Sequence, residues 1–412
     1  MADRSPFSIT DFRYYWVARL ASTVAQMSMV IVIGWQVYDT ARRMGMGIEA
    51  ASLQLGFIGL VQFVPLFLLT LVTGWTADRV DRRYIARASI ALELACAATL
   101  GWITYRHAVS LPWLFSIAAL LGVARAFAGP ALGALAPNLV PRSILPKAIA
   151  LSSMAWQSGS IAGPAVGGYL YAWAPHMPYA VASGLFAVSL TCMILIRPIA
   201  RTTMDASRNP WQQMIDGLHY VRRNRLVLGA ISLDLFAVLL GGATALLPIF
   251  ARDILQIGPQ GLGLLRAAPA AGAVIVGVVL ARRGIQRHAG VWLLGAVAVF
   301  GAATIGFGLS RSLPLAFVML AISGAADMFS VVIRQSLVQL DTPEDMRGRV
   351  GAVNSVFIGA SNQLGEFESG AVAALIGPVG SVLFGGVGTI LVVLAWWRLF
   401  PALAKRDRLR SD

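Results

Sequence analysis

Several ionisable side chains lie inside long apolar segments of this sequence, where a charge is costly unless it has a partner or a function. The bases are Arg125 and Arg266, and the acids are Glu93, Asp234, Asp327, Glu366 and Glu368. A carboxyl group in such surroundings can bind and release a proton near neutral pH, which suits it to proton transfer. We rank Asp234 and Glu366 first for that role.

Glu366 and Glu368 are close neighbours that cannot act as one site on a helix. They are two residues apart, which is about 200° around a helix of 3.6 residues per turn. We therefore expect at most one of them to face a central cavity, and the other to contact a neighbouring helix or a water-filled crevice.

The elements that position these residues are long apolar helices. The chain has 412 residues, of which 57% are hydrophobic and 13% are charged, with a mean hydropathy of +0.71. Soluble domains carry about 25% charged residues, and a membrane-spanning helix needs about 20 apolar residues. The sequence therefore predicts an all-α membrane protein with transmembrane helices near 17–38, 52–75, 85–105, 112–136, 147–172, 178–197, 226–250, 261–281, 289–309, 314–338, 350–375 and 380–400.

A polar stretch in the middle of the chain divides the helices into two sets of six. We predict an N-terminal bundle over 1–197, a cytoplasmic linker over 198–225, and a C-terminal bundle with a basic tail over 226–412. Within the linker, Trp211, Ile215, Leu218 and Val221 recur at helical spacing. This pattern predicts a short amphipathic helix on the membrane surface.

The basic residues indicate the orientation in the membrane. The net charge is +14, and most Lys and Arg residues follow the even-numbered apolar segments or lie at the two ends of the chain. The positive-inside rule then places both termini in the cytoplasm. We read this charge as a topology signal and not as a nucleic-acid surface. Arg19, Arg334 and Arg398 lie near the cytoplasmic ends of spans, where we expect them to reach the membrane surface.

The two halves repeat each other at a constant offset. Segment 120-LLGVARAF-127 aligns with 322-ISGAADMF-329, and the same offset aligns Gly163 with Gly365, Pro164 with Glu366 and Gly168 with Gly370. Duplication of a six-helix unit is typical of transporters, which bind their substrate between the repeats. Arg125 and Asp327 occupy equivalent positions in the two repeats.

The loop after the second span carries a motif. The segment 74-GWTADRVDRRYIA-86 resembles the signature loop of the major facilitator superfamily in Gly74, Asp78, Arg79, Arg82 and Arg83. The resemblance implies that this loop helps to hold one gate state. Asp81 stands where the family pattern has a glycine. A solvated basic turn is the simpler alternative.

The fifth span carries a second motif. Gly159, Gly163, Pro164, Gly167 and Gly168 lie in 159-GSIAGPAVGGYL-170. This run resembles the antiporter motif that exporters of the superfamily carry in span five, and it implies outward transport. A small-residue packing face is the alternative.

The segments 124-ARAFAGPALGALAPNLVP-141 and 343-PEDMRGRVGAVNSVF-357 extend the resemblance to a bacterial exporter branch that includes the enterobactin exporter and macrolide efflux proteins. The resemblance implies the twelve-helix major facilitator fold, with two pseudo-symmetric bundles and with Arg125 and Asp327 on opposing cavity walls. There they would bias substrate charge or form part of the proton path; a static ion pair is the alternative.

These observations together predict a monomeric secondary transporter in the bacterial inner membrane. We expect proton-coupled export of a small amphipathic organic compound, of drug or siderophore type, by alternating access. An importer or facilitator of the same fold and a non-transporting receptor or assembly protein are the alternatives. We expect no enzymatic activity, cofactor, metal ion or nucleic-acid partner, because no phosphate-binding loop, zinc-ligand spacing or nucleophile–base arrangement is present in the sequence.

Overall fold

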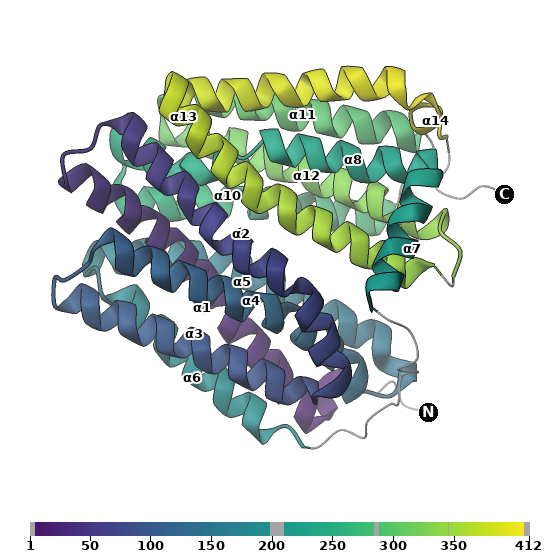
Figure 1. Cartoon of the computed structure of the whole chain (residues 1–412), viewed down its shortest axis with the longest axis horizontal. Coiled ribbons are helices and arrows are strands. Elements are labelled where there is room, and N and C mark those ends of the chain that lie inside the picture. The colour runs from purple at the N-terminus through teal and green to yellow at the C-terminus, as the bar shows by residue number, and fades with distance from the viewer. Residues whose placement is uncertain (1–4, 198–209, 284–287, 345, 408–412) are drawn as a thin grey trace. The chain divides into compact units, whose positions relative to one another are not determined.

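The computed structural model describes residues 5–197, 210–283, 288–344 and 346–407, and within these ranges every regular element is helical (Figure 1). A few side chains inside helices also lie outside the description, among them those of Gly74, Asp78, Arg79, Trp211 and Arg283. The α-helices are α1 (Thr10–Arg43), α2 (Ile48–Arg79), α3 (Arg82–Tyr105), α4 (Leu111–Leu139), α5 (Leu145–Trp173), α6 (Met177–Leu195), α7 (Pro210–Arg223), α8 (Arg225–Leu240), α9 (Leu247–Ile249), α10 (Gly258–Arg283), α11 (Ala289–Leu309), α12 (Leu313–Leu340), α13 (Arg347–Leu399) and α14 (Pro401–Ala404).

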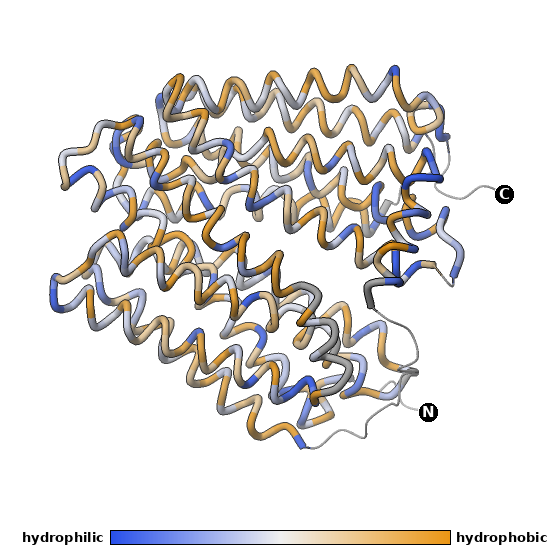
Figure 2. The backbone as a smooth tube through the Cα atoms, in the orientation of Figure 1, coloured by the Kyte–Doolittle hydropathy of each residue, from blue (hydrophilic) through white to orange (hydrophobic). Residues whose placement is uncertain are grey.

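The number of membrane-spanning segments agrees with the sequence prediction. Ten helices of the described chain are long and apolar enough to cross a membrane. Helix α5, with 29 residues, adds an eleventh segment of sufficient length. Helix α13 has 53 residues and contains two spans, which brings the total to twelve. Hydrophobic residues run along most of each long helix, and hydrophilic ones gather near the ends (Figure 2). The predicted all-α, twelve-helix fold is therefore confirmed.

The helical path is broken at two places, between the two spans of α13 and within the seventh span, and glycine lies at both. In α13 the backbone of Gly377 has a φ of +79°, and Pro378 follows it. A left-handed residue before a proline cannot continue a helix, so the chain turns there. The seventh span is interrupted after α8 at Gly241 and Gly242, and then continues through α9 and a π-helical turn over Phe250–Ile254.

The chain forms two compact units. Unit 1 comprises Met1–Thr40, Val64–Ser207 and Gly258–Ala267, and unit 2 comprises Ala41–Phe63, Arg208–Ile257 and Ala268–Asp412. In unit 1, α3 packs along both α4 and α6 (Figure 1). In unit 2, α13 packs along α8 and α11, and α11 packs along α12. Each unit holds most of one half of the sequence and a short segment of the other half.

Helix α7 belongs to unit 2 and packs on its other helices. Its side chains Val221 and Met214 contact the apolar core formed by α8, α11, α12 and α13. Gly217 lies so close to α13 that an added Cβ would be 2.7 Å from the carbonyl oxygen of Arg349, and Asp216 forms a 3.2 Å ion pair with the same arginine. Ile215 is 46% exposed on the opposite side. The linker helix therefore has one face on the bundle and an apolar residue facing away from it.

Candidate functional site

In unit 1 the candidate site is centred on Glu93, in the middle of α3. Its side chain is completely buried. Gln26 on α1 donates a 2.6 Å hydrogen bond from its Nε2 to Oε1 of Glu93. The second oxygen, Oε2, has no hydrogen-bond partner among the described residues. Arg125 on α4 is half-buried and lies within electrostatic range of the carboxyl group. Glu93 therefore has one fixed oxygen and one oxygen that is available to carry a proton.

The start of α3 is capped by Asp81, the residue of the signature loop that stands where the family pattern has a glycine. Asp81 caps the helix by accepting a 2.9 Å hydrogen bond from the backbone N–H of Arg83, and its carboxylate also binds the Arg83 guanidinium at 2.6 Å. Arg83 in turn donates to the carbonyl oxygen of Ile196 at the end of α6. Arg82 is half-buried. The side chains of Gly74, Asp78 and Arg79, which complete the predicted gating loop, lie outside the described residues.

In unit 2, Asp234 on α8 lies beside an arginine that the sequence analysis had assigned to the membrane surface. Its carboxylate forms an ion pair with Arg334 on α12, and both side chains are buried, at 7% and 3% exposure. The prediction that Arg334 reaches the membrane surface is wrong, because this arginine turns inward to neutralise Asp234. A buried pair of this kind is stable only while both partners are present.

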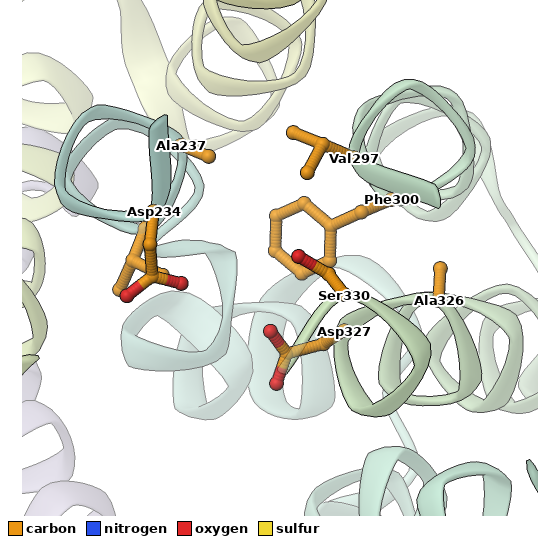
Figure 3. A pocket seen from close by; sticks show the side chains of 8 residues that line it. Asp234, Ala237, Val297, Phe300, Ala326, Asp327 and Ser330 are labelled. Carbon is orange, nitrogen blue, oxygen red and sulfur yellow. The ribbon is translucent and has the colours of Figure 1, made fainter. Parts of the chain in front are cut away.

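A small pocket lies beside this pair, between α8, α11 and α12 (Figure 3). Asp327, in the middle of α12, lines the pocket with an exposed side chain and has no hydrogen-bond or ion-pair partner among the described residues. Ser330, one turn further along, is 6% exposed and also lacks a hydrogen-bond partner in the described part of the chain. Phe300 and Val297 supply the apolar wall from α11. The pocket thus combines a carboxylate, a hydroxyl group and an aromatic ring.

The remaining candidates lie on α10 and α13. Glu366 is half-buried and packs on α2: a Cβ added at Gly59 would be 2.7 Å from the Cβ of Glu366. Glu368 is also half-buried and accepts a 3.4 Å hydrogen bond from the hydroxyl of Ser369 on its own helix. Arg266 on α10 is half-buried. The two glutamates therefore have different surroundings, as expected from their spacing.

The glycine-rich motif of α5 has two faces. A Cβ added at Gly159 or Gly163 would lie 2.7 Å from Thr23 or 2.6 Å from Met27 on α1, and one added at Gly167 would meet Ser28 on the same helix. Gly168 packs on the first residues of α10, where an added Cβ would be 3.0 Å from the Cα of Gly263. Beside it, the carbonyl oxygen of Pro164 also faces Gly263. The motif thus holds α5 against two helices at once.

The repeat-equivalent glycine in α13 makes the same kind of contact in unit 2. A Cβ added at Gly370 would lie 2.5 Å from the Cα of Gly56 on α2. Gly168 and Gly370, which the sequence repeat aligns, are therefore both sites of close helix crossing against another glycine. The residue four positions before the crossing glycine differs between the repeats: it is Pro164 in the first and Glu366 in the second.

The sequence analysis missed two residues of these sites, Gln26 and Ser330, and assigned a third, Arg334, to the membrane surface. A signal exists for Ser330 and Arg334. Asp327, Ser330 and Arg334 are spaced i, i+3 and i+7, which places them on one face of α12. Gln26 offered no such signal, because its partner Glu93 lies on another helix.

Comparison with known proteins identifies the family. A family described as transmembrane secretion effector, within the major facilitator superfamily, matches residues 1–411. The chain belongs to this family. It is therefore a multi-pass membrane protein of a transporter family and not of an enzyme family. An uncharacterised transporter of the superfamily, YfiS from Bacillus subtilis strain 168, is 28% identical over 365 residues, which cover 84% of each chain. The enterobactin exporter EntS from Escherichia coli O1:K1 / APEC is 25% identical over 391 residues, covering 92% of this chain and 89% of the exporter.

Solved structures share the fold. A POT family transporter in complex with 5-aminolevulinic acid has a TM-score of 0.74 at 13% identity and covers 96% of this chain and 97% of its own. A D-xylose–proton symporter has a TM-score of 0.73 at 15% identity, covering 95% and 98%. At such identities these structures support the fold alone, which is that of the major facilitator superfamily.

Proposed function

We propose that this protein is a proton-coupled exporter of small amphipathic organic compounds in the bacterial inner membrane. It works as a monomer by alternating access, with both termini in the cytoplasm. Membership of a transporter family with an exporter relative supports transport. The relative's substrate, a siderophore, is one candidate class of cargo, and drug-like compounds are the other.

The single observation that carries proton coupling is the environment of Glu93. A completely buried carboxyl group with one oxygen held by Gln26 and the other without a hydrogen-bond partner among the described residues suits a group that exchanges a proton. Asp234 fits this role less well than the sequence suggested, because Arg334 compensates its charge. We therefore place Glu93 first, and we keep Asp327, Glu366, Glu368 and Asp234 as further candidates.

The basic candidates and the motifs have supporting roles in this proposal. Arg125 attracts the ionised form of Glu93 and, with Arg266 and Asp327, biases the charge of the substrate. The signature loop at Gly74, Asp78, Arg79, Arg82 and Arg83 holds a gate state. The α5 motif supports the outward direction through its resemblance to the antiporter motif of exporters, and its glycines let α5 contact α1 and α10 at close range.

Everted membrane vesicles from cells that express the protein test this function. Respiration acidifies the vesicle lumen and quenches a pH-sensitive dye. A cargo that exchanges for protons should enter the lumen and restore the fluorescence. We expect such recovery with members of a panel of siderophores and amphipathic drugs, and none in vesicles without the protein.

A matched pair of variants ties the signal to the site. Glu93→Gln should abolish the cargo-induced recovery, whereas Glu49→Gln, an exposed acid in the first turn of α2, should leave it unchanged. Recovery that persists in Glu93→Gln would refute the role of Glu93. Cargo that moves out of the vesicle lumen would favour the importer, and cargo that binds without moving would favour the receptor.

A further inference from the structure

We propose that the pocket between α8, α11 and α12 binds a protonated amino group of the cargo, so that the exported compounds are organic cations or carry a cationic head. This inference rests on the proposed transport function and names the class of its substrate. The pocket of Figure 3 lies within unit 2 and is small, so it takes one group of the cargo and leaves the rest of the molecule outside it.

Two polar groups of the pocket lack partners of their own. The carboxylate of Asp327 and the hydroxyl of Ser330 both line the pocket, and neither has a hydrogen-bond partner among the described residues. The side chain of Ser330 is largely buried, at 6% exposure, and its hydroxyl oxygen is available to a bound group. An ammonium group has three N–H donors, which can satisfy the carboxylate and the hydroxyl oxygen together.

The charge of the pocket favours a cation. Asp234 also lines the pocket, but its charge is compensated by Arg334 in the buried ion pair. The other lining residues are Ala237, Val238, Val297, Phe300, Ala326 and Ser330, none of which is charged. One uncompensated negative charge therefore remains, on Asp327. A cationic cargo group would supply the counter-ion that this carboxylate lacks among the described residues, and a neutral group would not.

The aromatic wall completes the site. Phe300 projects from α11 into the space between Ala237 and Ser330 (Figure 3). Its ring is held by the break in the seventh span, because a Cβ added at Gly241 would lie 2.5 Å from Cε1 of Phe300. An aromatic ring beside a carboxylate attracts organic cations through its π face and also packs on their apolar carbons. The wall thus matches the amphipathic character proposed for the cargo.

Binding to the purified full-length protein tests the inference. The probes are 4-phenylbutylamine, which is cationic at neutral pH, and 4-phenylbutanol, its neutral counterpart of almost the same size. Thermal-shift titration should show that the wild type binds the amine at least about tenfold more tightly than the alcohol, since a charge-assisted hydrogen bond contributes about that factor.

Variants assign the preference to the pocket. Asp327→Asn should remove the preference and leave the affinity for the alcohol unchanged, and Ser330→Ala should weaken it in part. Glu344→Gln changes an acid whose side chain is 89% exposed and should behave as the wild type. The melting temperature of each variant without ligand shows whether it is folded. Ser330→Ala supplies the test if Asp327→Asn is unstable.

The results separate this inference from the proposed function. Equal binding of amine and alcohol, absence of amine binding, or an undiminished preference in folded Asp327→Asn or Ser330→Ala would each overturn the amine site, whatever the transport assay shows. If the amine preference depends on Asp327 but no pH-driven transport is found, the site stands as a binding site and the proton-coupled exporter is refuted.

Discussion

The two units each bury a carboxylate in the middle of a long helix, but the two carboxylates have different partners. Asp234 in unit 2 is bound by Arg334, so its charge is compensated within the protein. Glu93 in unit 1 has an amide donor on one oxygen and no hydrogen-bond partner among the described residues on the other. The first arrangement holds two helices together, and the second leaves a carboxyl group able to change its protonation state. We therefore propose that the partner of a buried carboxyl group, and not burial alone, decides whether it can carry a proton.

The largest expected difference between the two carboxylates is in stability. Asp234→Asn leaves the Arg334 guanidinium buried without a counter-charge, which should cost about 3–5 kcal/mol. Glu93→Gln keeps an oxygen for the Gln26 hydrogen bond and should cost about 1 kcal/mol or less. Unfolding in detergent measures both. The double variant Asp234→Leu/Arg334→Met should recover most of the loss, and equal losses in the two single variants would contradict the comparison.

The close helix crossings should respond alike in both units. An added methyl group at Gly168 or Gly370 has no space, so Gly168→Ala and Gly370→Ala should each cost about 1–3 kcal/mol. Gly133→Ala and Gly348→Ala are matched controls, because no atom lies within 4 Å of a Cβ added at either position. A loss at only one of the two crossings, measured by thermal unfolding, would show that the repeats are not packed equivalently.

The smallest effects should come from the caps of the two helices that carry the carboxylates. Asp81 caps α3 and Asn224 caps α8, each by accepting backbone N–H groups of the first turn. Asn224→Ala should lower the free energy of unfolding by about 1 kcal/mol. Asp81→Ala should lower it further, because it also removes the ion pair with the buried Arg83 guanidinium. Asn224→Ala changes neither a carboxylate in the membrane nor a residue of the signature loop, so pH-driven transport per folded molecule should persist. Loss of coupling in Asn224→Ala would mean that the start of α8 has a direct role.

The fold was accessible from the sequence because each span is specified locally. Apolar runs of about 20 residues predict helices in a membrane without knowledge of their neighbours. The run that contains α5 was predicted in spite of its many small and polar residues. The break at Gly377 and Pro378 likewise matches the gap between the last two predicted spans.

The contacts between side chains of different helices could not be predicted from the sequence in the same way. Asp234 and Arg334 lie on different helices, and sequence alone does not say which faces of α8 and α12 meet. Arg334 was therefore assigned to the membrane surface, and its ion pair with Asp234 was not foreseen. Glu93 was found as a buried acid, but its significance depends on Gln26 on α1, a contact that only the tertiary structure provides.

The most direct test of the central claim compares two modes of transport in proteoliposomes containing Glu93→Gln. Exchange of labelled for unlabelled cargo at equal concentrations requires only alternating access, whereas accumulation against a gradient requires the proton. We predict that Glu93→Gln retains exchange and loses accumulation driven by an imposed pH gradient, while the wild type and Glu49→Gln show both. Accumulation by Glu93→Gln at the wild-type level would contradict it.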